Sequence, residues 1–165
     1  MKVYMTIGTF DYLKELRKKY QNEKMLLMLN QDDALLLHET IGETVFKEPR
    51  SYEVFDSLGE MRAGEFVVMN NIPVSDEGRP LFEHRFKNRP KTIENEPGFV
   101  AIRVLRPLLS NTYVILTGWK DENSFLQWQH SKAFTSSHEG KKDEFNSQPK
   151  IFTSTSYLTK FQISD

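Results

Sequence analysis

The chain has 165 residues and a formal net charge of −1, with 38% hydrophobic and 12% aromatic residues. This composition predicts a folded protein with a bulky aromatic core. The absence of Cys excludes disulfides, thiolate nucleophiles, iron–sulfur ligation and thiolate-ligated haem. Acidic and basic residues interleave without a basic stripe, so we expect no nucleic-acid partner. No apolar run approaches the roughly 20 residues of a spanning helix, so we expect a cytoplasmic protein without a membrane span.

The first sixty residues predict the element order β-α-β-β-α. The expected elements are a strand over 2–8, a helix over 10–20, a hairpin of strands over 25–29 and 34–41, and a short helix over 52–58. The last helix is predicted by the three-residue spacing of Tyr52, Phe55 and Leu58. Ser51 is its expected N-cap and Gly59 its expected end.

The rest of the chain repeats this order and adds a strand. The expected elements are strands over 65–74, 99–105, 112–117 and 156–163, and helices over 79–89 and 122–130. Two tandem β-α-β-β-α units, 1–62 and 63–165, predict an α+β fold of duplicated ferredoxin-like units. Because helices cover one face of each sheet, the two open faces can pack together as a β-barrel of the dimeric type within one chain. We therefore expect a monomer.

The stretch from Trp119 to His138 is the most informative for function. Asp121 is a plausible N-cap for a helix carrying Trp128, and Ser131 can begin a second short turn. In one straight helix His138 would lie about 80° around and about 15 Å along the axis from Trp128. A bend at Ser131 would let both side chains line one cavity for a large flat ligand. The alternative is a core tryptophan and a surface histidine.

Asn70 and Asn71 are unusual in a strand rich in Val, Ile and Phe. Successive side chains of a strand point to opposite faces, so one of these amides should lie in the core or in a pocket. A buried amide needs a hydrogen-bond partner, which a bound ligand can supply. A β-bulge or a polar strand edge explains the pair equally well.

Other motifs give little support to metal, hydrolase or nucleotide chemistry. His38 lies in an apolar strand and is expected to be a satisfied, partly buried residue, whereas His84 and His130 lie on polar helix faces. No two histidines have the spacing of a paired metal site. The chain also lacks GxSxG, GxGxxG and phosphate-loop motifs.

One ordered run of residues carries a family resemblance. From Asn70 to His138 the chain reads NNIPV…EGRPLFEHRFKNRP…ENEPGF…VLRP…YVILTGW…FLQWQHSKAF…H. This run resembles the antibiotic-biosynthesis-monooxygenase domain and, within it, the IsdG-type haem-degrading monooxygenases. With its N-terminal unit, the whole chain is most similar to the two-part HmoB-type haem monooxygenases, whose relatives include the TRAP signalling proteins.

The resemblance implies a set of site residues. The family's proximal histidine, the axial ligand of the haem iron, falls on His138, and its distal Asn and Trp fall on Asn70 and Trp128. Trp119 is not the matched tryptophan. Helical geometry adds Phe86 as a pocket wall and Arg89, or less favourably Arg85, as a partner of a haem propionate.

The resemblance also implies an activity. Haem would be both cofactor and substrate, and the porphyrin ring would be cleaved with dioxygen and electrons from a reductase or an ascorbate-like reductant, releasing iron and a bilin-type product. Two alternatives remain. One is a non-enzymatic regulatory member of the TRAP-like family, and the other is a cofactor-independent monooxygenase on the same fold.

Overall fold

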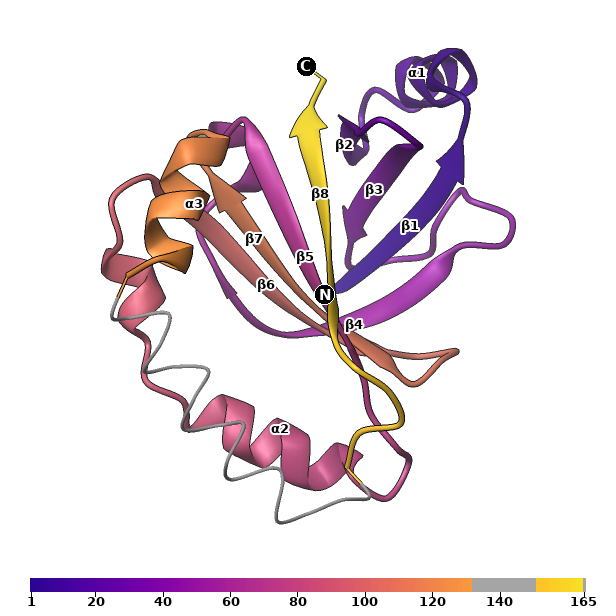
Figure 1. The fold of residues 1–165 in the computed structure, drawn as a ribbon. Helices are drawn as coiled ribbons and strands as arrows, with labels where there is room; N and C mark the ends of the chain where they lie inside the picture. The colour runs from indigo at the N-terminus through magenta and orange to yellow at the C-terminus, as the bar shows by residue number, and fades with distance from the viewer. Residues whose placement is uncertain (132–150, 165) are drawn as a thin grey trace.

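The computed structural model describes residues 1–131 and 151–164. Within them, eight antiparallel strands close into a barrel with helices on its outside (Figure 1). The elements, in chain order, are β1 (Lys2–Gly8), α1 (Phe10–Lys19), β2 (Lys24–Leu29), β3 (Ala34–Thr40), β4 (Arg50–Leu58), η1 (Met61–Ala63), β5 (Phe66–Pro73), α2 (Arg79–Lys87), η2 (Thr92–Asn95), β6 (Phe99–Pro107), β7 (Thr112–Trp119), α3 (Glu122–Gln129) and β8 (Tyr157–Ile163). None of these helices is long and apolar enough to cross a membrane.

The barrel is built from two units with the same strand order. The order around the barrel is β1-β3-β2-β8-β5-β7-β6-β4, so β4-β1-β3-β2 in the first unit corresponds to β8-β5-β7-β6 in the second. Val3 of β1 pairs with Tyr52, as Val67 of β5 pairs with Phe161, and all four side chains fill the barrel interior. The expected α+β barrel of tandem ferredoxin-like units is therefore confirmed. The boundary between residues 62 and 63 stays a prediction.

The two seams between the units differ in length. The β4–β6 seam joins six residue pairs, from Tyr52↔Pro107 to Leu58↔Ile102. The β2–β8 seam joins two, Met28↔Ile163 and Leu29↔Gln162. Backbone pairing between the units thus lies mainly along β4 and β6.

The helix expected over 52–58 is wrong, because these residues form strand β4. A β-bulge shifts the register between Val54 and Asp56. Tyr52 and Val54 therefore face the barrel interior, whereas Phe55 packs outside it. Tyr52 and Phe55 therefore lie on opposite faces of a strand that is packed on both faces. The three-residue spacing of two such apolar residues is also typical of a helix. Residues 41–49, between β3 and β4, contain no helix either.

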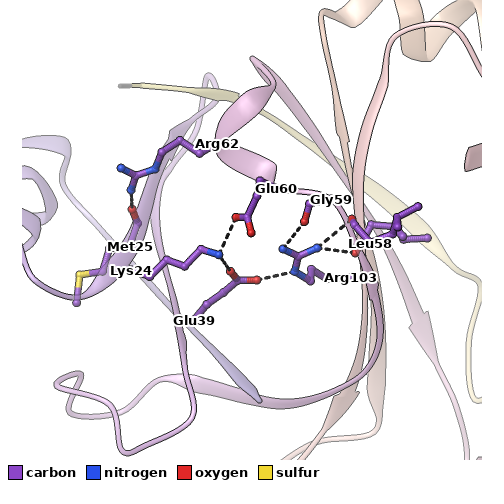
Figure 2. A network of polar contacts seen from close by, with 9 residues as sticks. Lys24, Met25, Glu39, Leu58, Gly59, Glu60, Arg62 and Arg103 are labelled. Atoms are coloured by element: carbon purple, nitrogen blue, oxygen red, sulfur yellow. Dashed lines mark hydrogen bonds and ion pairs between the residues drawn. The ribbon is translucent and has the colours of Figure 1, made fainter.

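A buried ion pair links the units inside one end of the barrel (Figure 2). Arg103 of β6 donates through Nε to Oε1 of Glu39 in β3 at 2.6 Å, and both side chains are almost fully buried. The Arg103 guanidinium also donates to the carbonyl oxygens of Leu58 and Gly59. Lys24 Nζ lies 3.0 Å from the other Glu39 oxygen. Each buried charge therefore has the partners that burial requires.

Among residues 1–131 and 151–164, three α-helices cover the outer wall. Leu13 of α1 packs on the first unit, and Thr9 caps this helix by accepting a hydrogen bond from the Tyr12 amide. On the second unit, α2 packs Phe82 and Phe86 against the sheet, and α3 packs Phe125 and Trp128. Both α2 and α3 therefore lie on the outer face of the sheet that contains β5 (Figure 1).

Candidate functional site

The outer face of β5 carries the candidate site. Val68 packs in the aromatic cluster under α3, and Ile72 packs in the cluster under α2. Asn70 lies between them on the same face, because side chains two residues apart share a face of a strand. In the register it is opposite Ile115 of β7 and Leu158 of β8. A polar amide thus lies between two apolar clusters.

The two asparagines have opposite environments. Asn71 is buried in the barrel wall and donates through Nδ2 to the Tyr157 carbonyl at 3.1 Å, to Thr159 Oγ1 at 2.9 Å and to the Met69 carbonyl at 3.3 Å. The half-buried side-chain amide of Asn70 makes no hydrogen bond to any described residue. Asn71 is therefore a structural bridge to β8, whereas the Asn70 side chain makes no such bridge within the described residues.

Trp128 lies where the sequence placed it, on α3. Asp121 caps this helix by accepting hydrogen bonds from the Ser124 amide and hydroxyl at 2.8 and 2.7 Å. These hydrogen bonds hold the pKa of the Asp121 carboxyl below its usual value, and the one from the Ser124 hydroxyl has the larger effect. The cap sets the start of the helix and so directs Trp128 toward the sheet, where the residue is 8% exposed.

The Trp119 ring packs against the Trp128 ring. Trp119 is fully buried at the end of β7, and its indole N–H donates to Thr117 Oγ1 at 3.0 Å. The ring centres of Trp119 and Trp128 are 5.6 Å apart, and that of Phe125 is 6.1 Å from Trp128. Such close ring contacts restrict the orientation of the Trp128 indole.

Phe86 and Arg89 lie at the end of α2, but Arg89 has a partner of its own. Its guanidinium donates to Asp56 Oδ2 at 3.0 Å and stacks on the Phe86 ring at 4.3 Å. It also donates to the Phe86 carbonyl at 2.9 Å. Asp56 comes from β4 of the first unit, so that unit contributes to the wall around Phe86. No sequence signal identifies Asp56, because the bulge decides where it lies.

A second charged cluster fixes α2 to the sheet. Glu83 accepts a bidentate pair of hydrogen bonds from Arg106 of β6, Nε to Oε2 and Nη2 to Oε1, and another from the Tyr113 hydroxyl of β7. Burial raises the pKa of the Glu83 carboxyl, but these hydrogen bonds outweigh it and hold the pKa below its usual value. Burial and the hydrogen bond to Glu83 raise the pKa of Tyr113. Sequence reasoning missed this cluster, because its members lie 23 and 30 residues after Glu83 in the chain.

The remaining predicted residues are placed as follows. His138 lies outside the described residues. Arg85, the alternative propionate partner, is half-buried on α2. His38 is fully buried between Thr44 Oγ1 and Glu23 Oε2, each at 3.1 Å, so it is satisfied as expected. His84 and His130 are exposed. Within 1–131 and 151–164, no three His, Asp or Glu side chains come together as a metal site.

Known proteins resemble this chain in sequence and in fold. Residues 65–140, which include Asn70, Phe86 and Trp128, match the family described as antibiotic biosynthesis monooxygenase. The haem-degrading monooxygenase of Listeria monocytogenes is 29% identical over 130 residues, which are 79% of this chain and 78% of that protein. The resemblance expected from the run between Asn70 and His138 is thereby confirmed.

Proteins named as regulators resemble this chain to about the same degree as the Listeria enzyme does. The signal transduction protein TRAP of Staphylococcus epidermidis is 27% identical over 134 residues, which are 81% of this chain and 80% of that protein. A solved structure described as a major regulator of staphylococcal pathogenesis superposes with a TM-score of 0.86 at 25% identity, covering 98% of both chains. Enzymes and named regulators thus share this architecture.

Proposed function

We propose that this protein is a haem-degrading monooxygenase that binds haem over Asn70. The observation that carries the proposal is the half-buried Asn70 amide, which lacks a hydrogen-bond partner among the described residues and lies between two aromatic clusters. A flat, largely apolar ligand with an acceptor above its plane fits this surface. The likeness to the Listeria enzyme supports haem as that ligand.

Each site residue has a distinct proposed role. Asn70 would donate a hydrogen bond to the bound ligand, and His138 would coordinate the haem iron. Trp128, held by its contact with Trp119, would contact the porphyrin, and Phe86 would line the site on the α2 side. When bound, haem supplies both the redox-active iron and the ring that is oxidised, with dioxygen and an external reductant as co-substrates.

Arg89 requires a narrower proposal than the sequence suggested. Its ion pair with Asp56 and its stacking on Phe86 make it a holder of the α2 wall. A propionate would have to displace Asp56 to reach it. Arg89 therefore lines the site, and a propionate would bind another cationic residue.

A haem titration tests the proposal. Purified protein is mixed with increasing hemin, the Soret band is followed, and ascorbate is added with catalase present. We expect a shifted Soret band that decays into a longer-wavelength bilin spectrum. Asn70→Ala should still bind haem but should lose at least tenfold in the rate of decay, since one charge-stabilising donor contributes on this scale. His138→Ala should lose the Soret shift.

The regulatory function is the second candidate, favoured by the similarity to TRAP over four fifths of the chain. A Soret shift without decay would favour haem sensing or transport. No spectral change at all would favour the regulatory function or a cofactor-independent monooxygenase.

We also propose that one chain completes the barrel as a monomer. Residues 1–62 form the first unit and residues 63–165 the second. Gel filtration with light scattering tests this proposal, and a dimer mass would contradict it.

A further inference from the structure

The strand β8 borders the candidate site with one apolar and one cationic side chain. Leu158 is directly opposite Asn70 and is 44% exposed. Lys160 is two residues further on, opposite Val68, and so lies on the same outer face. Its half-buried side chain reaches toward α3, where Nζ lies 5.4 Å from the centre of the Phe125 ring. Trp128 packs on that same ring.

The Lys160 ammonium has no acidic partner among the described residues, whereas three arginines of the second unit are engaged. Arg89 is paired with Asp56, and Arg106 with Glu83. Arg79 donates to the Pro107 carbonyl at 2.7 Å. Lys160 therefore keeps its charge available at the edge of an apolar surface.

The backbone at Lys160 is held by the first unit. Asn30, in the turn between β2 and β3, donates through Nδ2 to the Lys160 carbonyl at 3.1 Å. The Asn30 side-chain oxygen accepts from the amides of Asp32 and Asp33, which fixes the turn. A fixed backbone lowers the entropy cost of presenting the ammonium to a ligand.

From this placement we propose that Lys160 binds a carboxylate of the ligand that lies over Asn70, which for haem is a propionate. The inference rests on the proposed function and names a residue outside the matched range 65–140. The ammonium forms a charge-assisted hydrogen bond to the carboxylate, and Leu158 contacts the apolar edge beside it. The first unit thereby supports ligand binding through Asn30.

Paired titrations test this role. Wild type, Lys160→Gln, Lys160→Arg and Lys14→Gln are each titrated with hemin and with hemin dimethyl ester, which lacks free carboxylates. Lys14 is the matched control, because its Nζ also lies over a phenylalanine ring, that of Phe10 in the first unit, at 5.7 Å. We expect Lys160→Gln to weaken hemin binding about fivefold, the size of a solvent-screened ion pair, and to leave ester binding unchanged. Lys160→Arg and Lys14→Gln should match wild type.

The outcomes separate this inference from the proposed function. A wild-type Soret shift with unchanged hemin affinity in Lys160→Gln overturns the inference alone. So does an equal loss for hemin and for the ester, which would show a packing role. No Soret shift in wild type overturns the proposed function and this inference together. If Lys160→Gln does not fold, wild type is titrated with hemin and with hemin dimethyl ester at low and at high salt. Salt should weaken the binding of hemin but not that of the ester, and equal effects on both would overturn the inference.

Discussion

Asn70 and Asn71 are consecutive in β5, yet Asn71 donates three hydrogen bonds inside the barrel wall while the Asn70 amide, outside it, meets no partner among the described residues. Asn71→Ala should therefore lower the free energy of unfolding by about 1–3 kcal/mol, because it leaves buried acceptors unpaired. Asn70→Ala should change it by less than about 0.5 kcal/mol. Urea unfolding measures both, and equal losses would contradict the assignment of separate roles.

The ion pair between Glu39 and Arg103 should contribute strongly to stability. Glu39→Gln leaves the buried Arg103 guanidinium without its carboxylate, so we expect a loss of about 3 kcal/mol in the free energy of unfolding. Lys24→Gln, which removes the half-exposed partner of the same carboxylate, should cost no more than about 1 kcal/mol. Chemical denaturation of both variants measures the two losses. Similar losses would show that the buried pair of Glu39 and Arg103 contributes no more to stability than the half-exposed contact with Lys24.

Glu83 should make stability depend on pH. Its folded pKa is depressed, since the hydrogen bonds from Arg106 and Tyr113 outweigh the effect of burial. Its contribution is therefore present above the unfolded pKa, about 4.3, and is lost as pH falls through the folded value. At pH 7 the free energy of unfolding of wild type should exceed that of Glu83→Gln by about 1 kcal/mol. The difference is no larger because solvent screens this half-exposed pair. Denaturation from pH 7 to pH 3 should show the gap closing, and a gap independent of pH would contradict the prediction.

Asp56 and Arg89 should be energetically coupled across the two units. Arg89 has a 5% exposed side chain and would lose its carboxylate in Asp56→Asn. We expect Asp56→Asn and Arg89→Gln to be non-additive by about 1–2 kcal/mol in a double-mutant cycle of unfolding free energies. Haem titration of the same variants should show weaker binding if the pair holds Phe86 in place. Additive effects would show that the contact contributes little.

Local signals in the sequence were sufficient for most elements. Asp121 predicted the start of α3 because an N-cap acts within four residues of its own helix. The helix expected over 52–58 is wrong because Tyr52 and Phe55 lie on opposite faces of a strand that is packed on both faces. That packing depends on the closed barrel and on α2, which the spacing of residues does not reveal. Periodicity alone does not distinguish these cases.

The candidate site was predictable only in part. The alternation of a strand showed that one of Asn70 and Asn71 faces inward, but the closed barrel decides which. Helical geometry placed Arg89 near Phe86, whereas its partner Asp56 comes from a strand that the sequence presented as a helix. Both the face on which Asn70 lies and the partner of Arg89 are set by pairing between distant strands, which residue patterns do not reveal. The role of His138 stays a prediction from the family resemblance.

The joining of two units in one chain bears on binding stoichiometry. A barrel assembled from identical copies would present each surface twice. In this chain the strand position that corresponds to Asn70 is Thr6, opposite Leu36 as Asn70 is opposite Ile115. The outer face of the first unit is packed by α1 and by Phe46 against the buried His38 ring. A saturating titration should therefore end at one ligand per barrel.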